Sequence, residues 1–490
     1  MLEHLANGLI AILAIKPLLA MLIGTTLGVF VGAIPGLTST MGIALLIPFT
    51  YNLDVLTALG LLAGIHNGAS YGGAIPAILL RIPGTHGAIV TCFDGYPMAQ
   101  KGEAAGALKV AAVSSAVGGM LSAVALLAFA LPLAEVTLAF GPPEIFWVNM
   151  FGLASVSLLL QGDPIKGLMG ACFGMLVGVV GLDNVTGHER FTFGIIELTS
   201  GIPLLVVMVG LFSLPPTWAM AERSGMVAGA MEGLNRSYVG KIWRSGEIVV
   251  TWLKSSAIGI FIGILPGASG IGSFIAYGEA RRASKNPESF GTGNPVGVAA
   301  AESVNNADNA ASMVPALTLG IPGGGAAALM LAALLIHGLQ PGPRLFENSP
   351  EIFYGYTIQM FFTSAMLLFV GGAVASRFFA GVLRLPMPLL MPLVICMTAI
   401  AAYAVENNTY FVGVMLVFGL IGLVMDRLRF PIAPVIIGLV LGAPAELNLR
   451  ISLLIAQGDP SILWTRPISQ VVIAMTVLVA LVPVWRHFRS

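Results

Sequence analysis

Long apolar segments, each interrupted by a few Pro and Gly positions, dominate the hydrophobic pattern of the chain. The first runs from about residue 5 to residue 49 and is broken at Lys16-Pro17 and again at Ile34-Pro35-Gly36. Others cover roughly residues 110–133, 145–160, 167–182 and 194–214, and the longest polar stretch lies near the middle, at about 217–250. Because a helix needs roughly 20 apolar residues to cross a bilayer, the pattern predicts about 10 to 12 transmembrane helices.

Two of the Pro-Gly patterns return in the second half of the chain. In motif A, residues 28–40, the part Gly28–Gly36 matches Gly259–Gly267 at a shift of 231 positions. In motif B, Gly64–Thr85, the part Pro76–Gly84 matches Pro315–Gly323 at a shift of 239. A third, shorter match follows at a shift of 267. Three matches in the same order predict an internal repeat, with a first transmembrane repeat at residues 1–216, a cytoplasmic linker at 217–250 and a second transmembrane repeat at 251–490.

The distribution of basic residues indicates that the two repeats are inverted relative to each other. In the first repeat the loop between motifs A and B has no Lys or Arg, and the loop after motif B has Lys101 and Lys109. In the second repeat the A–B loop carries Arg281, Arg282 and Lys285, and the loop after B is acidic overall. Basic loops stay on the cytoplasmic side. The loop after motif B is therefore predicted inside in the first repeat, whereas the loop between motifs A and B is predicted inside in the second. Each motif A is then either a broken span or a re-entrant hairpin.

Composition places the chain in a membrane. It is 57% hydrophobic and only 9% charged, with a mean hydropathy of +0.92, whereas soluble domains carry about 25% charged residues. The apolar segments are too long for a β-barrel, which predicts an all-α polytopic protein. Cys92, Cys172 and Cys396 show no metal-ligand spacing, no P-loop for ATP is present, and nothing indicates binding to nucleic acid.

The segment 301–324 is the main candidate site because it concentrates polar residues in an apolar chain. Polar groups at bilayer depth are costly unless they are paired or face a cavity or a ligand. We predict ion coupling by Glu302, Asn305 and Asp308, with a Na⁺ site near Asn305 and Asp308 as one option. Asn306 and Asn309 each directly follow one of these residues, and Asn67, Ser70 and Tyr71 occupy the counterpart positions of Asn306, Asn309 and Ala310 in the first repeat.

The Pro-Gly turns are the second part of the predicted site. Broken helices expose N–H groups that suit a carboxylate and carbonyl groups that suit Na⁺. The predicted substrate-binding residues are Pro35, Gly36, Thr38, Ser39, Asn67, Ser70, Tyr71, Pro83, Gly84, Thr85, Pro266, Gly267, Ser269, Asn306, Asn309, Pro322, Gly323 and Gly324. The alternative is that the Pro and Gly residues only kink helices and the amides only bond between them. Arg81 either binds a substrate carboxylate, extends to the membrane surface or pairs with Asp94.

One enzyme pattern needs weighing. Gly267-Ala-Ser269-Gly270 fits the G-x-S-G of intramembrane serine proteases, with His337 as a conceivable partner. The equivalent positions of the first repeat read Gly36-Leu-Thr38-Ser39, however, and a nucleophile has no reason to recur as a degenerate repeat element. We therefore predict that the chain is not an enzyme and needs no cofactor.

Three long segments resemble a known family. VGAIPGLTSTMGIALLIPFTY, GASYGGAIPAILLRIPGT and ESVNNADNAASMVPALTLGIPGGGAAALML are similar to the large membrane subunit of tripartite tricarboxylate transporters, and the likeness extends from about Leu18 to about Pro444. The resemblance implies a small membrane subunit with about four spans and a periplasmic solute-binding protein as partners. It also implies import of a carboxylate such as citrate, driven by an ion gradient, usually of Na⁺, without ATP.

Residues and resemblance together lead to one expectation. The chain is predicted to be a multi-pass protein of the bacterial inner membrane and the translocating permease of a binding-protein-dependent secondary transporter, with Na⁺ or H⁺ as the coupling ion. A stand-alone ion-coupled organic-anion symporter and a channel remain as alternatives. The particular carboxylate, the ion stoichiometry, the oligomeric state and the surface used by partner subunits stay open.

Overall fold

The protein is almost entirely helical in its computed structural model. The structure describes residues 2–34, 37–85, 87–137, 139–159, 163–183, 186–222, 246–265, 271–371, 392, 395–400, 402–403 and 407–487. Within these ranges the only strands are β1 (Gly181–Leu182) and β2 (Glu189–Arg190), which form one antiparallel pair.

The helices of the first half of the chain are α1 (Leu2–Ile12), α2 (Ile15–Ala33), α3 (Ser39–Thr50), α4 (Val55–Gly72), α5 (Ala74–Leu80), α6 (Ala88–Gln100), α7 (Ala104–Thr137), α8 (Pro142–Leu159), α9 (Pro164–Gly178), η1 (Ile196–Leu198) and α10 (Leu204–Glu222). Those of the second half are α11 (Gly246–Ile264), α12 (Ile271–Ala283), η3 (Pro287–Ser289), α13 (Pro295–Ala311), α14 (Met313–Leu319), α15 (Gly325–Ile336), α16 (Pro343–Asn348), α17 (Pro350–Phe369), α20 (Thr409–Arg427), α21 (Ala433–Ile455), α22 (Ile462–Thr465) and α23 (Pro467–His487).

Local sequence explains where many helices begin. Asp54 accepts a hydrogen bond from the Thr57 N–H at 3.0 Å, and Asn294 accepts one from the Val296 N–H at 2.9 Å, so both residues cap the exposed amides of a first turn. Pro occupies the first helical turn of α9, α13, α16 and α17, where its missing N–H costs no hydrogen bond. These signals fix the starts of α4 and α13, the two helices that carry the candidate site.

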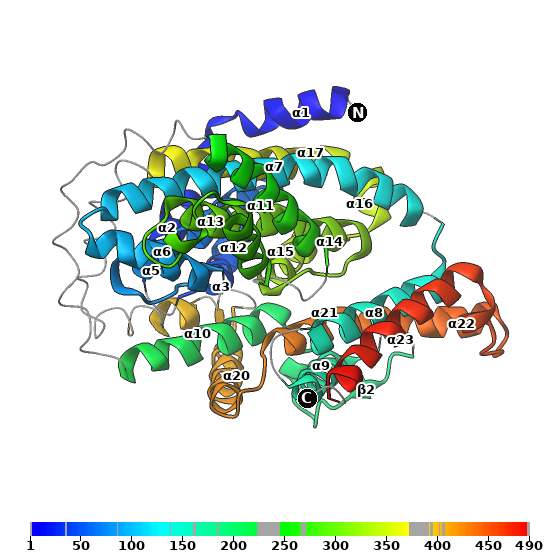
Figure 1. Ribbon diagram of the computed structural model, residues 1–490. Helices are drawn as coiled ribbons and strands as arrows, with labels where there is room; N and C mark the ends of the chain where they lie inside the picture. The colour runs from blue at the N-terminus through cyan, green and yellow to red at the C-terminus, as the bar shows by residue number, and fades with distance from the viewer. Residues whose placement is uncertain are drawn as a thin grey trace.

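The helices form two layers (Figure 1). One layer contains α1–α7 and α11–α17, and it therefore holds motifs A and B of both halves. The other layer contains α8–α10 and α20–α23 and lies along one side of the first. The motif helices and their polar residues are thus gathered in one body, and the remaining spans pack against it.

Glycine allows α2 to pack closely against α4. A Cβ on Gly28 would lie 2.6 Å from the Ile65 carbonyl oxygen, and a Cβ on Gly72 would lie 2.6 Å from that of Val29. Gly24 and Gly32, one turn to either side of Gly28, face α4 in the same way. The spacing of these glycines at every fourth position lets the two backbones touch, as small residues do in membrane helix pairs.

In both halves the helices that flank the Pro-Gly segment of motif A contact each other. Gly42 on α3 faces the Val31 side chain of α2, and Gly272 on α12 faces the Ile262 side chain of α11. Each contact joins positions on opposite sides of the Pro-Gly segment, as in a hairpin. Whether these hairpins are re-entrant in a bilayer stays a prediction.

Both copies of motif B break a helix in the same place. Pro76 and Pro315 lack the N–H that would bond the carbonyl four residues earlier, and the chain passes from α4 to α5 and from α13 to α14 just before them. The short helices end at Arg81 and Gly320, both in the left-handed conformation with φ of 58° and 71°. The two copies of motif B therefore share a local backbone conformation, while the internal repeat and the inversion of the halves stay predictions.

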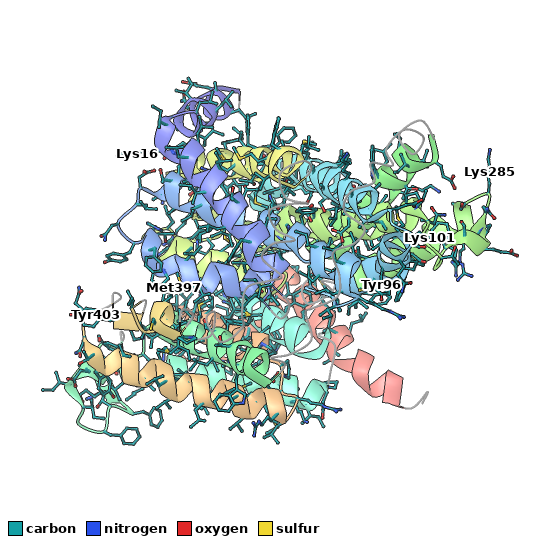
Figure 2. All side chains as sticks on the ribbon, turned by 90° about the vertical axis from the view of Figure 1, so that its left-hand side faces the viewer. Lys16, Tyr96, Lys101, Lys285, Met397 and Tyr403 are labelled. Atoms are coloured by element: carbon teal, nitrogen blue, oxygen red, sulfur yellow. The ribbon has the colours of Figure 1, made fainter. Side chains whose placement is uncertain are left out.

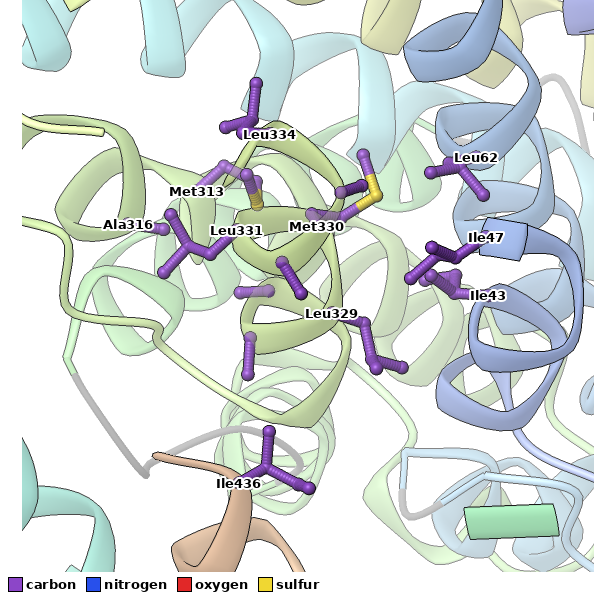
Figure 3. Packing of buried hydrophobic residues seen from close by; sticks show 14 of the residues in the cluster. Ile43, Ile47, Leu62, Met313, Ala316, Leu329, Met330, Leu331, Leu334 and Ile436 are labelled. Atoms are coloured by element: carbon purple, nitrogen blue, oxygen red, sulfur yellow. The ribbon is translucent and has the colours of Figure 1, made fainter. Parts of the chain in front are cut away.

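The largest apolar cluster surrounds α15 (Figure 3). Leu329, Met330 and Leu331 are fully buried, and they contact α3, α4, α14 and α21 on different sides of the helix. A helix that is apolar all round is typical of the core of a large protein or of a membrane span. The cluster joins the two layers directly behind the second motif B turn.

Six described helices, α2, α7, α11, α17, α20 and α21, are long and apolar enough to cross a membrane, and five shorter apolar helices accompany them. The loops predicted to share one side are adjacent, since Lys101 Nζ donates to the Thr292 carbonyl at 2.6 Å. Figure 2 shows Lys101 and Lys285 at one edge of the molecule and Lys16 and Tyr403 at the opposite edge. Most of the predicted linker, 223–245, lies outside the described residues; α10 reaches Glu222 and α11 begins at Gly246.

Candidate functional site

Polar side chains of the two motif B helices meet in the interior. Asn309 of α13 donates to Asn67 Oδ1 at 2.9 Å and accepts from Ser70 Oγ at 3.1 Å. One turn away, Asn306 Nδ2 donates to the Asn67 carbonyl at 3.2 Å. None of these four side chains is more than 5% exposed. The pairing joins positions that the repeat equates, because Asn67 matches Asn306 and Ser70 matches Asn309 at the shift of 239.

A third helix completes this amide cluster. Asn67 Nδ2 lies 2.9 Å from Thr363 Oγ1, 3.0 Å from Ser364 Oγ and 3.2 Å from the Met360 carbonyl, all on α17. Asn306 Oδ1 is buried and has no hydrogen-bond partner among the described residues. An oxygen left in that state carries a desolvation cost, and it is the atom of the cluster most suited to a cation or a ligand donor.

Glu302 lies two turns before Asn309 on α13 and is completely buried. Its Oε1 accepts from Thr91 Oγ1 of α6 at 2.5 Å, and its Oε2 accepts from Ser115 Oγ of α7 at 3.0 Å. Among the described residues no basic side chain pairs with it. A carboxylate held by two hydroxyls in an apolar bundle is the type of oxygen-rich site that can take up a proton or a monovalent cation.

Asn305 and Asp308 face the turns. Asn305 Nδ2 donates to the Ser70 carbonyl at 2.9 Å, and its side chain packs against Gly87, where a Cβ would lie 2.7 Å from Asn305 Cγ. Asp308 lies against motif A of its own half, since a Cβ on Gly263 would lie 2.8 Å from Asp308 Oδ1. The two residues therefore connect the amide cluster to a motif B turn and to a motif A helix.

The motif B turns pack identically in the two halves. A Cβ on Gly84 would lie 2.6 Å from Gly73 Cα and 3.0 Å from the Gly32 carbonyl. At the equivalent position, a Cβ on Gly323 would lie 2.8 Å from Ser312 Cβ and 2.9 Å from the Gly263 carbonyl. Each turn thus lies on the end of its own motif A helix and allows no larger residue.

The remaining predicted residues have local roles or fall outside the described residues. Thr38 caps α3 through a hydrogen bond from the Met41 N–H, and the Thr85 hydroxyl accepts one from the N–H of Ala88, the first residue of α6. The Tyr71 hydroxyl donates to the Gly371 carbonyl at 2.7 Å. Ser39 is the first residue of α3, and Pro322 and Gly324 lie in the second motif B turn, just before α15. Pro83 is exposed. Pro35, Gly36, Pro266, Gly267 and Ser269 lie outside the described residues.

Sequence reasoning missed several partners. Thr91, Ser115, Thr363 and Ser364 are isolated hydroxyl residues in apolar helices, and no spacing marks them. Asp94 does not pair with Arg81. Its Oδ1 accepts from the N–H groups of Gly291, Gly293 and Asn294 at 2.8 Å each, and its Oδ2 accepts from the Tyr277 hydroxyl at 2.8 Å. Arg81 instead lies over the Tyr96 ring at 5.8 Å.

A many-helix apolar body with broken helices and a buried amide and carboxylate cluster belongs to the class of multi-pass membrane transport proteins. The profile of the tripartite tricarboxylate transporter TctA family matches residues 18–437. The chain belongs to this family, and it is therefore a membrane component of tricarboxylate-type transport.

Two relatives come from Agrobacterium vitis. An uncharacterized 52.8 kDa protein of the TAR-I ttuC' 3' region is 35% identical over 477 residues, which cover 96% of this chain and 94% of the relative. An uncharacterized protein of the TAR-II ttuC' 3' region is 33% identical over 236 residues, which cover 47% of this chain and 97% of the relative. No solved structure matches the chain.

Proposed function

We propose that the chain is the translocating permease of a binding-protein-dependent secondary transporter that imports carboxylates across the bacterial inner membrane, driven by a cation gradient, with Na⁺ favoured over H⁺. One observation carries the proposal. Polar side chains from two broken helices, α4 and α13, meet inside an otherwise apolar body. Ion and substrate sites of secondary transporters are built in this way.

The partners in this proposal are a small four-span membrane subunit and a periplasmic solute-binding protein, as the family description "tripartite" implies. The substrate class is a di- or tricarboxylate, for which citrate is the first test. Glu302 and Asp308 are the two acidic side chains on the polar face of α13, and we assign ion coupling to them together with Asn305. The Pro-Gly turns would supply backbone ligands and the pivot for alternating access.

The test is uptake of labelled citrate into proteoliposomes that hold the chain and its small subunit, with the binding protein supplied outside. Na⁺ and proton gradients are imposed separately. We expect uptake to follow one gradient and to require the binding protein. Glu302→Gln and Asp308→Asn should each uncouple uptake from that gradient at normal protein levels. Glu279→Gln, which alters an exposed carboxylate on α12, is the matched control and should keep coupling.

Three outcomes would each refute a different part of the proposal. Uptake without the binding protein would indicate a stand-alone symporter. Uptake that continues downhill with no dependence on either gradient would indicate a channel. Unchanged coupling in both acidic variants would assign Glu302 and Asp308 a structural role only.

A further inference from the structure

A large cavity lies between the two layers, away from the amide cluster. Its volume is about 1,080 Å³, and helices α8, α9 and α21 of one layer and α14 and α16 of the other line it; Figure 1 shows these elements stacked on each other. Thr318, Leu319 and Gly320 form part of its wall. These residues directly precede the second motif B turn, so the cavity ends where the predicted translocation site begins. Its size is at the upper end of small-molecule sites, about 300–1,000 Å³.

The basic loops place this cavity on the outer side. Helix α9 begins next to Lys166, a basic residue that favours the cytoplasmic side, and the cavity is lined by its far end at Gly178. Helix α21 follows Arg427 and Arg429, two further basic residues that favour the cytoplasmic side, and the cavity is lined by its later part, Val440–Ile451. Both helices therefore point their cavity-lining ends away from the cytoplasm.

Arginines gather at this cavity although the outer side is poor in positive charge. Arg190, Arg344 and Arg450 all line it. Arg450 Nη1 donates to both carboxylate oxygens of Asp183, at 2.9 and 3.0 Å, and its Nη2 bonds Glu446. Arg190 pairs with Glu446 at 2.9 Å. Two arginines and two carboxylates thus form a neutral network on the wall.

In the part of the chain that the structure describes, two N–H groups on the wall are buried without an acceptor, and an exposed arginine beside them lacks a carboxylate partner. Asn149 is 4% exposed, and its Nδ2 is buried with no hydrogen-bond partner among the described residues. Arg190 Nε is in the same state. Arg344 donates only a long bond of 3.4 Å to the neutral Gln340 amide, and among the described residues no carboxylate lies within ion-pair distance of it, although Glu347 follows one turn later.

The N–H donors on the cavity wall determine which class of ligand the cavity can bind. Buried polar groups normally have partners, and the two left over here, on Asn149 and Arg190, are N–H donors rather than oxygen acceptors. Arg344 is exposed at the cavity. Arginine forks match carboxylates in a planar, bidentate way. A ligand with two or three carboxylates could occupy the unpaired donors while the Asp183 network keeps the rest of the wall neutral.

We propose that this cavity is an outward-facing vestibule that binds the di- or tricarboxylate substrate before it reaches the motif B turn, with Arg344, Arg190 and Asn149 as its contacts. This inference rests on the proposed function and adds a second, outer binding site to it. Arg344 is the contact that can be tested most cleanly, because its removal leaves the Asp183 network intact.

The experiment is cysteine labelling from outside. Cys172 and Cys396, which are exposed, are replaced by Ser, and Leu447→Cys places a thiol on the cavity wall. Right-side-out vesicles are treated with a membrane-impermeant maleimide, with and without citrate, succinate or benzoate at constant ionic strength. Leu454→Cys, an exposed position later on the same helix that does not line the cavity, is the matched control.

We expect the Leu447→Cys thiol to react from outside and citrate to slow this reaction saturably, by about tenfold at ten times its dissociation constant. Succinate should protect more weakly and benzoate least. Arg344→Gln should weaken protection by about tenfold or more, as expected for losing a charge-assisted bond, and Arg344→Lys should retain part of it. The Leu454→Cys control should react at the same rate throughout.

Failure of this inference can be told apart from failure of the proposed function. Labelling only from the cytoplasmic side, or no protection in vesicles that do import citrate, would overturn the vestibule and leave the transport proposal standing. Protection that is unchanged in Arg344→Gln would overturn the assignment of Arg344. Absence of import of all three carboxylates under every gradient would refute the transport proposal whatever the labelling shows.

Discussion

Helix α4, which carries Asn67 and Ser70 of the candidate site, is held in place by its contact with α2. Adding a single methyl group at Gly28 tests this contact. In Gly28→Ala the new Cβ would lie 2.6 Å from the Ile65 carbonyl oxygen and 2.8 Å from Ile65 Cα, both backbone atoms. Ordinary van der Waals contact begins at 3.4 Å. The two helices must therefore separate by roughly 0.8 Å, because carbon atoms pack best at about 3.5–4.0 Å.

The expected magnitude follows from two opposing terms. Alanine is favoured over glycine inside a helix by about 1 kcal/mol. Overpacking a well-packed contact costs about 1–3 kcal/mol, and a rigid backbone cannot move aside as a side chain can. Gly413 on α20 provides the control, since a Cβ there meets nothing within 4 Å. Both substitutions gain the same helix propensity, so their difference isolates the clash.

The assay is unfolding of the purified protein in mixed micelles with increasing SDS, followed by tryptophan fluorescence. Gly413→Ala should be neutral or slightly stabilising, and Gly28→Ala should be less stable than Gly413→Ala by about 1–3 kcal/mol. Equal stability of the two variants would mean that α2 and α4 do not touch at Gly28, and the argument that glycine spacing sets this contact would be wrong.

Three further outcomes can be measured on the same preparation. Asn67→Ala removes bonds to α17 and leaves Asn309 Nδ2 buried without its acceptor, so it should destabilise the protein by about 1–3 kcal/mol, whereas Asn52→Ala in an exposed loop should not. Tyr277→Phe removes one of four bonds to Asp94, and it should cost about 1 kcal/mol without changing the coupling ion. Glu302→Gln should keep the fold, because its hydroxyl partners can still bond an amide, while uptake loses its dependence on the gradient; loss of the folded protein would contradict this.

Much of the architecture could be predicted because the signals are local. Lengths of apolar segments give the helices, and Pro76 and Pro315 give the breaks between α4 and α5 and between α13 and α14. The shift of 239 pairs Asn67 with Asn306 and Ser70 with Asn309, and the structure brings these four side chains together. The match arises because two copies of one motif helix lie side by side at their equivalent positions.

Other features depend on tertiary packing that no local pattern encodes. Thr91 and Ser115 bind Glu302 only because α6 and α7 happen to face α13, and a hydroxyl in an apolar helix more often bonds its own backbone. The engagement of Asp94 by Tyr277 and the 291–294 loop depends on a contact between the two halves. The cavity near Arg344 arises from the stacking of the two layers, so its residues are spread from position 140 to 451.

The hydrogen bonds between α4 and α13 set the free energy that is needed to separate the two helices at the amide cluster. Four such bonds join Asn67 and Ser70 to Asn305, Asn306 and Asn309. Bonds of this kind between membrane helices contribute about 0.6 kcal/mol each on average, so breaking all four costs about 2–3 kcal/mol. A ligand with a micromolar dissociation constant binds with about 8 kcal/mol. Opening the cluster therefore offsets only a minor part of the binding free energy, and a polar ligand can replace these bonds one for one.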